Sequence, residues 1–395
     1  MANSILTPTA VTRKIQQVLH GKLFLAKRVN RQYDDSFAKS GGKIGDSLKI
    51  RMPNKYTVRT GKNLNAQDTS ETSETLTVAT QVGVDMTFSS AELTMSMDDF
   101  SERIIEPAAA VVASNIENAI AARYVDVPNL VGTAGTTPAS MLTVLQAGAR
   151  LDDNLVPRDG KRLVAMSPLA MASVVDAYKG LFQKDSKIAD QYDSGLIEDM
   201  ATGFKWGMCP VINSHTMSAG TVTGITVNDT VASGDDTVTI TTTTTTAIAA
   251  GTVVTFAGCY AVNDETKQAY PHLRQWVVES ATATVLTLTE AIVTSGATQN
   301  CSAIPTNSGA VTFSGSASTS YPQHLAFHRD WLALATADLE DVSKFGAWGA
   351  REVYDGISIR LARQYDINSD NIPCRLDVLY GVKQLRGALA VRITG

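Results

Sequence analysis

Few residues in this sequence have the types and spacing that known catalytic or metal-binding sites require. His324 and His328 are four positions apart, so on a helix they would share one face, as histidine pairs do in zinc sites. No third ligand follows, and the segment fits a strand equally well, which favours structural roles. Residues 41–46 are glycine-rich but lack the GxxxxGK[ST] spacing of a phosphate loop. We therefore predict no catalytic site, no metal site and no cofactor.

The cysteines and the first residues indicate the cellular compartment in which the protein is made. Cys209, Cys259, Cys301 and Cys374 are widely separated and form no CxxC pair, so reduced thiols are expected. The first residues lack a secretory pattern, and no apolar run approaches a membrane span. With 395 residues, 44% of them hydrophobic, and a net charge of −5, the chain can build one large or two medium cores. We expect synthesis in a cytoplasm.

The longest helical pattern spans residues 98–127, and the rest of the chain is interpreted around it. Its bulky residues recur at helical intervals: Phe100, Ile104, Val111, Val112, Ile116, Ile120, Tyr124 and Val127. A helix of this length would extend about 45 Å, with a bend expected at Pro107. Two interpretations stay open: a long core helix of an ordinary domain, and a spine against which neighbouring copies of the chain pack.

The segments before this helix suggest an arm and a hairpin. A helix is predicted over about residues 9–31, either as a partner-binding arm or as an amphipathic helix on its own domain. Alternating apolar residues then predict two long strands, about 43–53 and 76–88, joined by a polar segment. An isolated hairpin is marginally stable in water, so this one is expected to lie on another surface.

Charge suggests which surface that is. Residues 1–62 contain thirteen Lys and Arg against three acids, whereas residues 63–106 contain nine acids against Arg103. We hypothesise that the basic strand of one copy lies across the acidic helix start of the next; the alternative is two solvated faces that never meet. The candidate interface residues are Lys49, Arg51, Lys55, Arg59, Lys62, Asp98, Asp99, Glu102 and Glu106.

The remaining sequence divides by composition. Residues 129–220 read as a mixed helix and strand region, with helices near 138–151 and after Ser167-Pro168 and a buried strand at 162–166. A strand is also expected over about 209–214, and a polar loop over 179–199. Residues 221–320 contain short alternating runs rich in Thr, Val and Gly, which favour a small β-barrel or sandwich inserted into the chain. Residues 325–334 and a loop rich in Gly and Trp follow, and further strands are expected near 357–365 and 373–380.

Four segments together resemble the major capsid proteins of tailed phages, in the podovirus coat-protein family that carries an inserted I-domain. They are KIGDSLKIRMPNKYTVRTG (43–61), DDFSERIIEPAAAVVASNIENAIA (98–121), LAFHRDWLALA (325–335) and DVLYGVKQLRGALAVRI (377–393).

This resemblance implies an α+β fold of the Hong Kong 97 type with an inserted all-β barrel. The implied segments are an N-terminal arm (1–43), an E-loop hairpin (44–91), a P-domain spine helix (92–128), an A-domain (129–220), an I-domain barrel (221–320), an A-domain continuation (321–353), and P-domain strands with the C-terminus (354–395).

The resemblance also implies a structural function. The expected role is a major capsid (coat) protein that self-assembles into the icosahedral shell around a tailed phage's double-stranded DNA, in a virion. Implied partners are sister copies in hexamers and pentamers, a scaffolding protein, a portal protein, decoration proteins, and packaged DNA through weak contacts, with no membrane. The alternative is a β-rich surface adhesin or another polymerising structural protein; an enzyme with an accessory β domain comes third.

Overall fold

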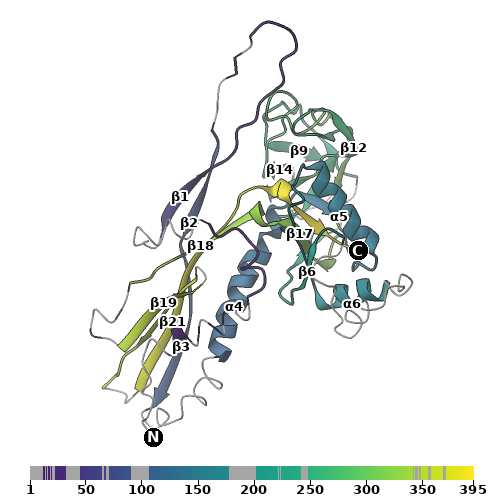
Figure 1. Cartoon of the computed structure of the whole chain (residues 1–395). Coiled ribbons are helices and arrows are strands. Elements are labelled where there is room, and N and C mark those ends of the chain that lie inside the picture. The colour runs from purple at the N-terminus through teal and green to yellow at the C-terminus, as the bar shows by residue number, and fades with distance from the viewer. Residues whose placement is uncertain are drawn as a thin grey trace, which may run out of the picture. The chain divides into compact units, whose positions relative to one another are not determined.

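A computed structural model describes most of the chain (Figure 1). The described residues are 12–32, 45–89, 106–177, 202–340, 342, 346 and 348–395, with gaps at 14, 16, 18, 20–22, 65, 68–70, 221, 223, 242–247, 355–356 and 368–370. The predicted loop at 179–199 therefore lies outside the described residues.

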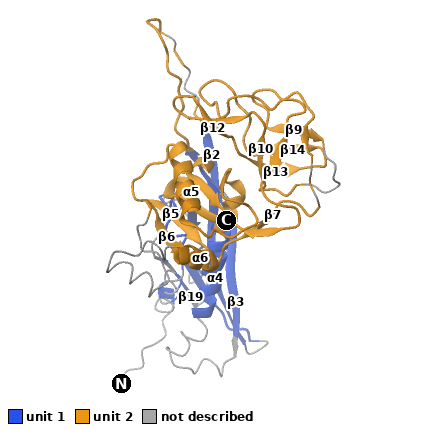
Figure 2. Ribbon diagram, turned by 90° about the vertical axis from the view of Figure 1, so that its right-hand side faces the viewer, with its two compact units in different colours: residues 1–50, 73–120, 332–385 blue, residues 51–72, 121–331, 386–395 orange. Residues whose placement is uncertain are grey.

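The chain forms two compact units, each assembled from separate stretches of sequence (Figure 2). Unit 1 comprises residues 1–50, 73–120 and 332–385, and unit 2 comprises residues 51–72, 121–331 and 386–395. Both units contain helices and strands, which agrees with the expected α+β class.

Unit 1 is built on an antiparallel sheet around one long strand, β21 (Asn371–Gln384). The strand order is β18-β21-β20-β19, and β3 also pairs with β21. The bounds are β3 (Thr80–Ser89), β18 (Leu332–Ala337), β19 (Trp348–Tyr354) and β20 (Ile357–Arg363). These strands confirm the predictions near 357–365 and 373–380, although β21 is longer than expected.

The predicted hairpin is present, but its second strand was assigned wrongly. β1 (Asp46–Arg51) pairs with β2 (Ser73–Val78), whereas β3 leaves that ladder and pairs with β21. β2 passes close to β21 at Gly381, where a Cβ atom would lie 2.2 Å from the Thr77 carbonyl oxygen. A glycine at this point permits the close approach, and the alternating pattern alone could not reveal that the chain changes partners at Ala79.

Helix α4 (Glu106–Ala121) carries the central helical pattern, and a 3-10 turn continues it through Ala122–Asp126. Its predicted stripe is buried at Val112, Ile116 and Ile120, but Val111 is 61% exposed. Two adjacent valines are separated by about 100° on a helix, so both cannot face the core. Pro107 lies in the first turn, where proline is tolerated, and residues 98–105 lie outside the described residues.

The helix predicted over about residues 9–31 is only partly correct. The described residues between 12 and 19 are helical, with Ile15 and Leu19 buried. Residues 23–29 instead form turns and bends, and Asn30 makes a parallel bridge to Ala333 of β18. Local periodicity does not encode the pairing of Asn30 with a distant strand.

Unit 2 contains a mixed sheet in the order β4-β22-β17-β5-β6, together with two helices. The strands are β4 (Asn129–Val131), β5 (Arg162–Met166), β6 (Lys205–Met208), β17 (His324–His328) and β22 (Ala390–Ile393), and the helices are α5 (Met141–Asp153) and α6 (Pro168–Ala177). The Ser167 hydroxyl accepts the Ala170 N–H at 3.3 Å, which confirms the predicted cap. The strand expected at 209–214 was misplaced, because the strands on either side of it are β6 and β7 (Ser214–Thr216).

The β-rich region of unit 2 has its own core. Six strands pair in the order β15-β10-β13-β14-β9-β8, and hydrogen bonds between Val227 and residues 308–309 join the two ends of this order. The sheet therefore closes as a barrel, one of the two predicted forms. The strands are β8 (Thr226–Val227), β9 (Thr237–Thr241), β10 (Val253–Phe256), β13 (Trp276–Ala281), β14 (Val285–Leu288) and β15 (Val311–Phe313). Trp276 and Phe256 pack at its centre, with ring centroids 5.5 Å apart.

The unit boundaries do not coincide with the segments expected from the resemblance. β18 pairs within the unit 1 sheet, and β22 pairs within the unit 2 sheet. The chain thus passes between the units near residues 331 and 385 rather than near residue 353. The seven expected segments remain proposals.

Candidate functional site

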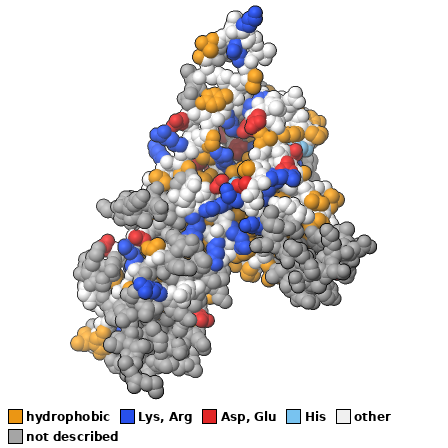
Figure 3. All heavy atoms as spheres, viewed as in Figure 1, with side chains coloured by type: hydrophobic (Ala, Val, Ile, Leu, Met, Phe, Trp, Pro, Cys, Tyr) orange, Lys and Arg blue, Asp and Glu red, His pale blue; other side chains and the backbone are white. Residues whose placement is uncertain are grey.

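The predicted basic residues lie along β1 and the loop that follows it. Lys49 and Arg51 are on β1, and Lys55, Arg59 and Lys62 are on the loop of residues 52–72; all five are exposed. We call this loop the projecting loop. Figure 3 shows Lys and Arg side chains beside hydrophobic ones on its surface, at the top of the view.

Three of these basic residues have partners in their own chain. Arg51 Nη1 lies 3.3 Å from a Glu71 carboxylate oxygen, and Lys55 Nζ lies 2.8 Å from Asp264 Oδ1. Arg59 donates to two backbone carbonyls of the projecting loop. The ion pairs are substantially exposed, so each is worth about 0–1 kcal/mol and leaves the cations available to another partner.

Most of the predicted acidic partners cannot be placed. Asp98, Asp99 and Glu102 lie outside the described residues, and Glu106 is the exposed first residue of α4. The charge hypothesis therefore stays a prediction about contacts between copies.

The projecting loop also carries apolar side chains, which the sequence interpretation missed by treating the segment as a polar tip. Tyr56 is 55% exposed, Val58 90% and Leu64 88%. The exposed leucine and valine side chains contribute no burial free energy to the isolated chain. Their burial against a partner would stabilise the contact between the two. The presence of Val58 and Leu64 within an otherwise polar stretch could have indicated this apolar surface from the sequence.

Hydrogen bonds across the projecting loop limit its conformations. Gln67 Nε2 donates to the Thr57 carbonyl at 2.6 Å, and the Thr57 N–H donates to Gln67 Oε1 at 2.8 Å. At the base of the loop, the Met52 N–H donates to the Thr72 carbonyl at 2.8 Å. The two arms of the loop are thus tied together, so less conformational freedom is lost when the loop binds a surface.

The two histidines lie on strand β17 rather than on a helix, and both are buried. His324 Nδ1 accepts the Ser167 N–H at 3.2 Å, and His328 Nε2 lies 3.1 Å from Asp159 Oδ1. Within the described part of the chain, no group of three His, Cys, Asp or Glu residues is arranged to hold a metal ion. The favoured structural interpretation fits these contacts.

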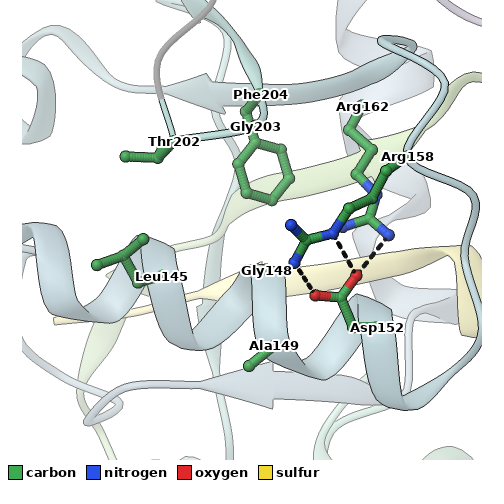
Figure 4. A pocket seen from close by; sticks show the side chains of 9 residues that line it. All are labelled: Leu145, Gly148, Ala149, Asp152, Arg158, Arg162, Thr202, Gly203 and Phe204. Atoms are coloured by element: carbon green, nitrogen blue, oxygen red, sulfur yellow. Dashed lines mark hydrogen bonds and ion pairs between the residues drawn. The ribbon is translucent and has the colours of Figure 1, made fainter.

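A hollow of about 180 Å³ lies between α5 and residues 202–204, just before β6 (Figure 4). Asp152 occupies its wall and accepts hydrogen bonds from Arg158 and from the buried Arg162. These hydrogen bonds, that of Arg158 foremost, lower the pKa of Asp152 and keep it ionised. The lining residues are Leu145, Gly148, Ala149, Asp152, Arg158, Arg162, Thr202, Gly203 and Phe204. A carboxylate held in this way is a poor base.

A buried cation joins three parts of unit 2. Arg392 on β22 is 1% exposed; its Nε donates to the Val127 carbonyl at 2.8 Å and its Nη1 to the Gly251 carbonyl at 2.6 Å. Its guanidinium carbon also lies 5.4 Å from the centroid of the Tyr124 ring. Burial lowers the pKa of Arg392 to about 10, which still leaves it protonated near neutral pH.

Acid should destabilise unit 2 through two histidines. Burial lowers the pKa of His215 and of His324 to about 4, and Arg392 adds to the effect at His215. Unfolded histidine titrates near 6.5, so the unfolded chain binds more protons as pH falls from about 6.5 to 4, and stability is lost across that window. The loss is on the order of 3 kcal/mol per histidine. Urea unfolding of the unassembled chain between pH 7.5 and 4.5 measures it.

The matched variant for this prediction is His324→Asn, which keeps an acceptor for the Ser167 N–H but does not titrate. It should remove the part of the pH dependence of stability that comes from His324 and leave the part that comes from His215. A wild-type unfolding midpoint that stays constant from pH 7 to 5 would contradict the assignment.

Comparison with known proteins gives one match that covers the whole chain. A family model described as "P22 coat protein - gene protein 5" matches residues 1–395. A search of curated proteins found no match. No described helix is both long and apolar enough to cross a membrane.

Several solved structures are similar at low sequence identity. A chain of Mycobacterium phage Che8 is 13% identical with a TM-score of 0.49, covering 94% of this chain and 90% of that one. The capsid of cyanophage P-SCSP1u is 10% identical with a TM-score of 0.42, covering 90% and 84%. A virus-like particle from Pyrococcus furiosus is 7% identical with a TM-score of 0.42, covering 98% of both chains.

Proposed function

The chain belongs to the P22 coat protein family and is a major capsid protein that forms the shell of a bacteriophage, and we propose how its copies hold together in that shell. The family is structural, and the protein is a component of the virion capsid. We propose that the chain has the Hong Kong 97-type arrangement, that it has no enzymatic activity, and that it needs no cofactor.

The projecting loop is proposed as the strap between sister subunits. The observation that carries this proposal is its set of exposed apolar side chains: Tyr56, Val58 and Leu64 are each more than half exposed. Burying a Val, Leu or aromatic side chain fully contributes about 1.5–3 kcal/mol. Apolar contact with a sister copy therefore supplies most of the association energy of the strap.

Charge is proposed to set the register of that contact. Arg59 and Lys62 on the projecting loop face solvent, as does Glu106 at the start of α4. In the proposed arrangement, this basic segment meets the acidic helix start of the next copy, including Asp98, Asp99 and Glu102. Surface pairs contribute less than apolar burial, but like charges brought into contact strongly oppose a wrong alignment.

Charge reversal tests the strap. Arg51→Glu or Arg59→Glu should each slow shell assembly several-fold, because each places a carboxylate against the acidic helix start. Glu106→Arg in the same chain should restore assembly. Light scattering during assembly gives the rates, with the unfolding midpoint of each unassembled variant as the control. Normal assembly by both single reversals would refute the charge contact.

The inserted barrel, proposed as an I-domain over residues 221–320, has its own sixteen-residue buried core and is suited to stabilising the subunit or contacting a neighbour. We propose icosahedral assembly around double-stranded DNA, with hexamers and pentamers formed in the host cytoplasm. Proposed partners are a scaffolding protein, a portal protein and decoration proteins, with DNA held weakly by the basic first sixty residues.

A further inference from the structure

Glu117 is a buried carboxylate that binds backbone rather than a neighbouring side chain. It lies on α4 and is 4% exposed. Its Oε1 accepts the N–H groups of Phe24 and Ala26 at 3.0 Å each, and its Oε2 accepts the Leu25 N–H at 2.7 Å. All three donors belong to the N-terminal arm, more than ninety positions away in the chain.

The geometry of the arm explains why it binds an anion. The N–H groups of Arg28 and Val29 donate to the Leu25 carbonyl at 2.9 and 3.2 Å, so a helical turn begins at Leu25. The first N–H groups of such a turn have no partner within it, and successive N–H groups form a cavity suited to an anion. The Arg28 guanidinium stacks 4.2 Å above the Phe24 ring, and its positive charge favours the ionised Glu117.

The same arm segment is buried and paired on its other side. Leu23, Leu25, Ala26 and Val29 are each 0–3% exposed. The Asn30 N–H donates to the Leu332 carbonyl at 3.1 Å, and the Leu334 N–H donates to the Asn30 carbonyl at 3.0 Å. Residues 23–30 are thus held between α4 and the first residues of β18, all within unit 1.

We propose that Glu117 is a latch that holds residues 23–30 of the N-terminal arm in place within unit 1. While the carboxylate holds residues 24–26, the apolar side chains of residues 23–30 stay buried. When the carboxylate contact is lost, residues 23–30 detach as one segment and expose four apolar side chains together with Lys27 and Arg28. An assembly partner that binds the buried face of residues 23–30 must first break the contact between these residues and Glu117.

The latch is expected to open without unfolding the sheet. Burial raises the pKa of Glu117, while the three N–H groups and Arg28 act in the opposite direction, so the closed state carries a desolvation cost that the open state lacks. Among the described elements packed here, β18 has no titratable side chain, and Tyr380 of β21 donates to Asn115 rather than to Glu117. Opening breaks the three hydrogen bonds from residues 24–26 to Glu117 and the short bridge between Asn30 and β18. Strand β21, in contrast, is paired with a neighbouring strand on both sides.

Glu117→Gln tests the latch, because the amide keeps the shape but turns a donor toward the Leu25 N–H. In the unassembled full chain, amide exchange at residues 23–30 should accelerate roughly tenfold or more, and trypsin cleavage after Lys27 or Arg28 should accelerate with it. Exchange at β21 should stay unchanged. Asn118→Gln, at an exposed site on the same helix, should match the wild type.

Two results would overturn the latch. One is wild-type exchange and cleavage of residues 23–30 in Glu117→Gln. The other is measured on the wild type alone, so it applies even if the variant does not fold. In low urea, the amides of residues 23–30 should exchange with a lower free energy of opening than the amides of β21. If both sets of amides exchange only together, residues 23–30 are part of the core and Glu117 is not a latch.

Discussion

Replacing Arg392 by methionine should cost about 3–5 kcal/mol of unfolding free energy, a large part of the roughly 5–15 kcal/mol that a folded domain has. Arg392 donates to carbonyls of Val125, Val127 and Gly251, which are brought together from two distant segments. Methionine fills similar space but leaves these buried acceptors without their donor, and each such acceptor costs about 1–3 kcal/mol. Urea unfolding of the unassembled chain measures the loss.

The control for this prediction is Arg386→Met, six positions earlier in the C-terminal segment. Arg386 is exposed, so its replacement should change stability by no more than about 0.5 kcal/mol. If Arg392→Met also fell within that range, Arg392 would not be the residue that joins β22 to the loop at Gly251 and to residues 125–127.

Placing aspartate at both Val58 and Leu64 should abolish shell assembly while leaving the isolated subunit intact. The two side chains are 90% and 88% exposed, so the unassembled chain loses almost nothing when they change. In the shell, the double variant forfeits about 3–6 kcal/mol of apolar burial per strap and must also desolvate two carboxylates. A loss of that size lowers each contact constant by more than about a hundredfold.

Thr60→Asp is the control, since Thr60 is exposed on the same loop and gains one of the two negative charges without losing apolar surface. It should assemble at a rate closer to that of the wild type. Sedimentation separates shells from subunits in all three proteins. Shells of normal yield from the double aspartate variant would show that the projecting loop does not cover a sister copy.

Hydrophobic periodicity and capping residues correctly predicted the elements that depend on residues close by in the sequence. Ile116 and Ile120 are buried as their helical spacing indicates, and the buried strand at 162–166 is β5. The cap at Ser167 and the β-rich character of the region after residue 221 followed in the same way. Each depends on residues within one or two turns or one ladder, so the sequence itself contains the signal.

The remaining features depend on partners far away in the chain. The ladder of β3 with β21 joins residues almost three hundred positions apart, and it alone separates β3 from β2. Glu117 looks like an ordinary helix residue until Phe24, Leu25 and Ala26 lie against it. The resemblance to phage coat proteins supplied the overall class, but no rule of spacing could give these pairs.

Electron microscopy of the purified full chain, after assembly with its scaffolding partner where one is needed, tests the central claim most directly. The account predicts closed shells of uniform size in which the projecting loop of each subunit lies against a sister subunit. Discrete monomers or fibres under every condition, or shells in which that loop folds back on its own subunit, would contradict it.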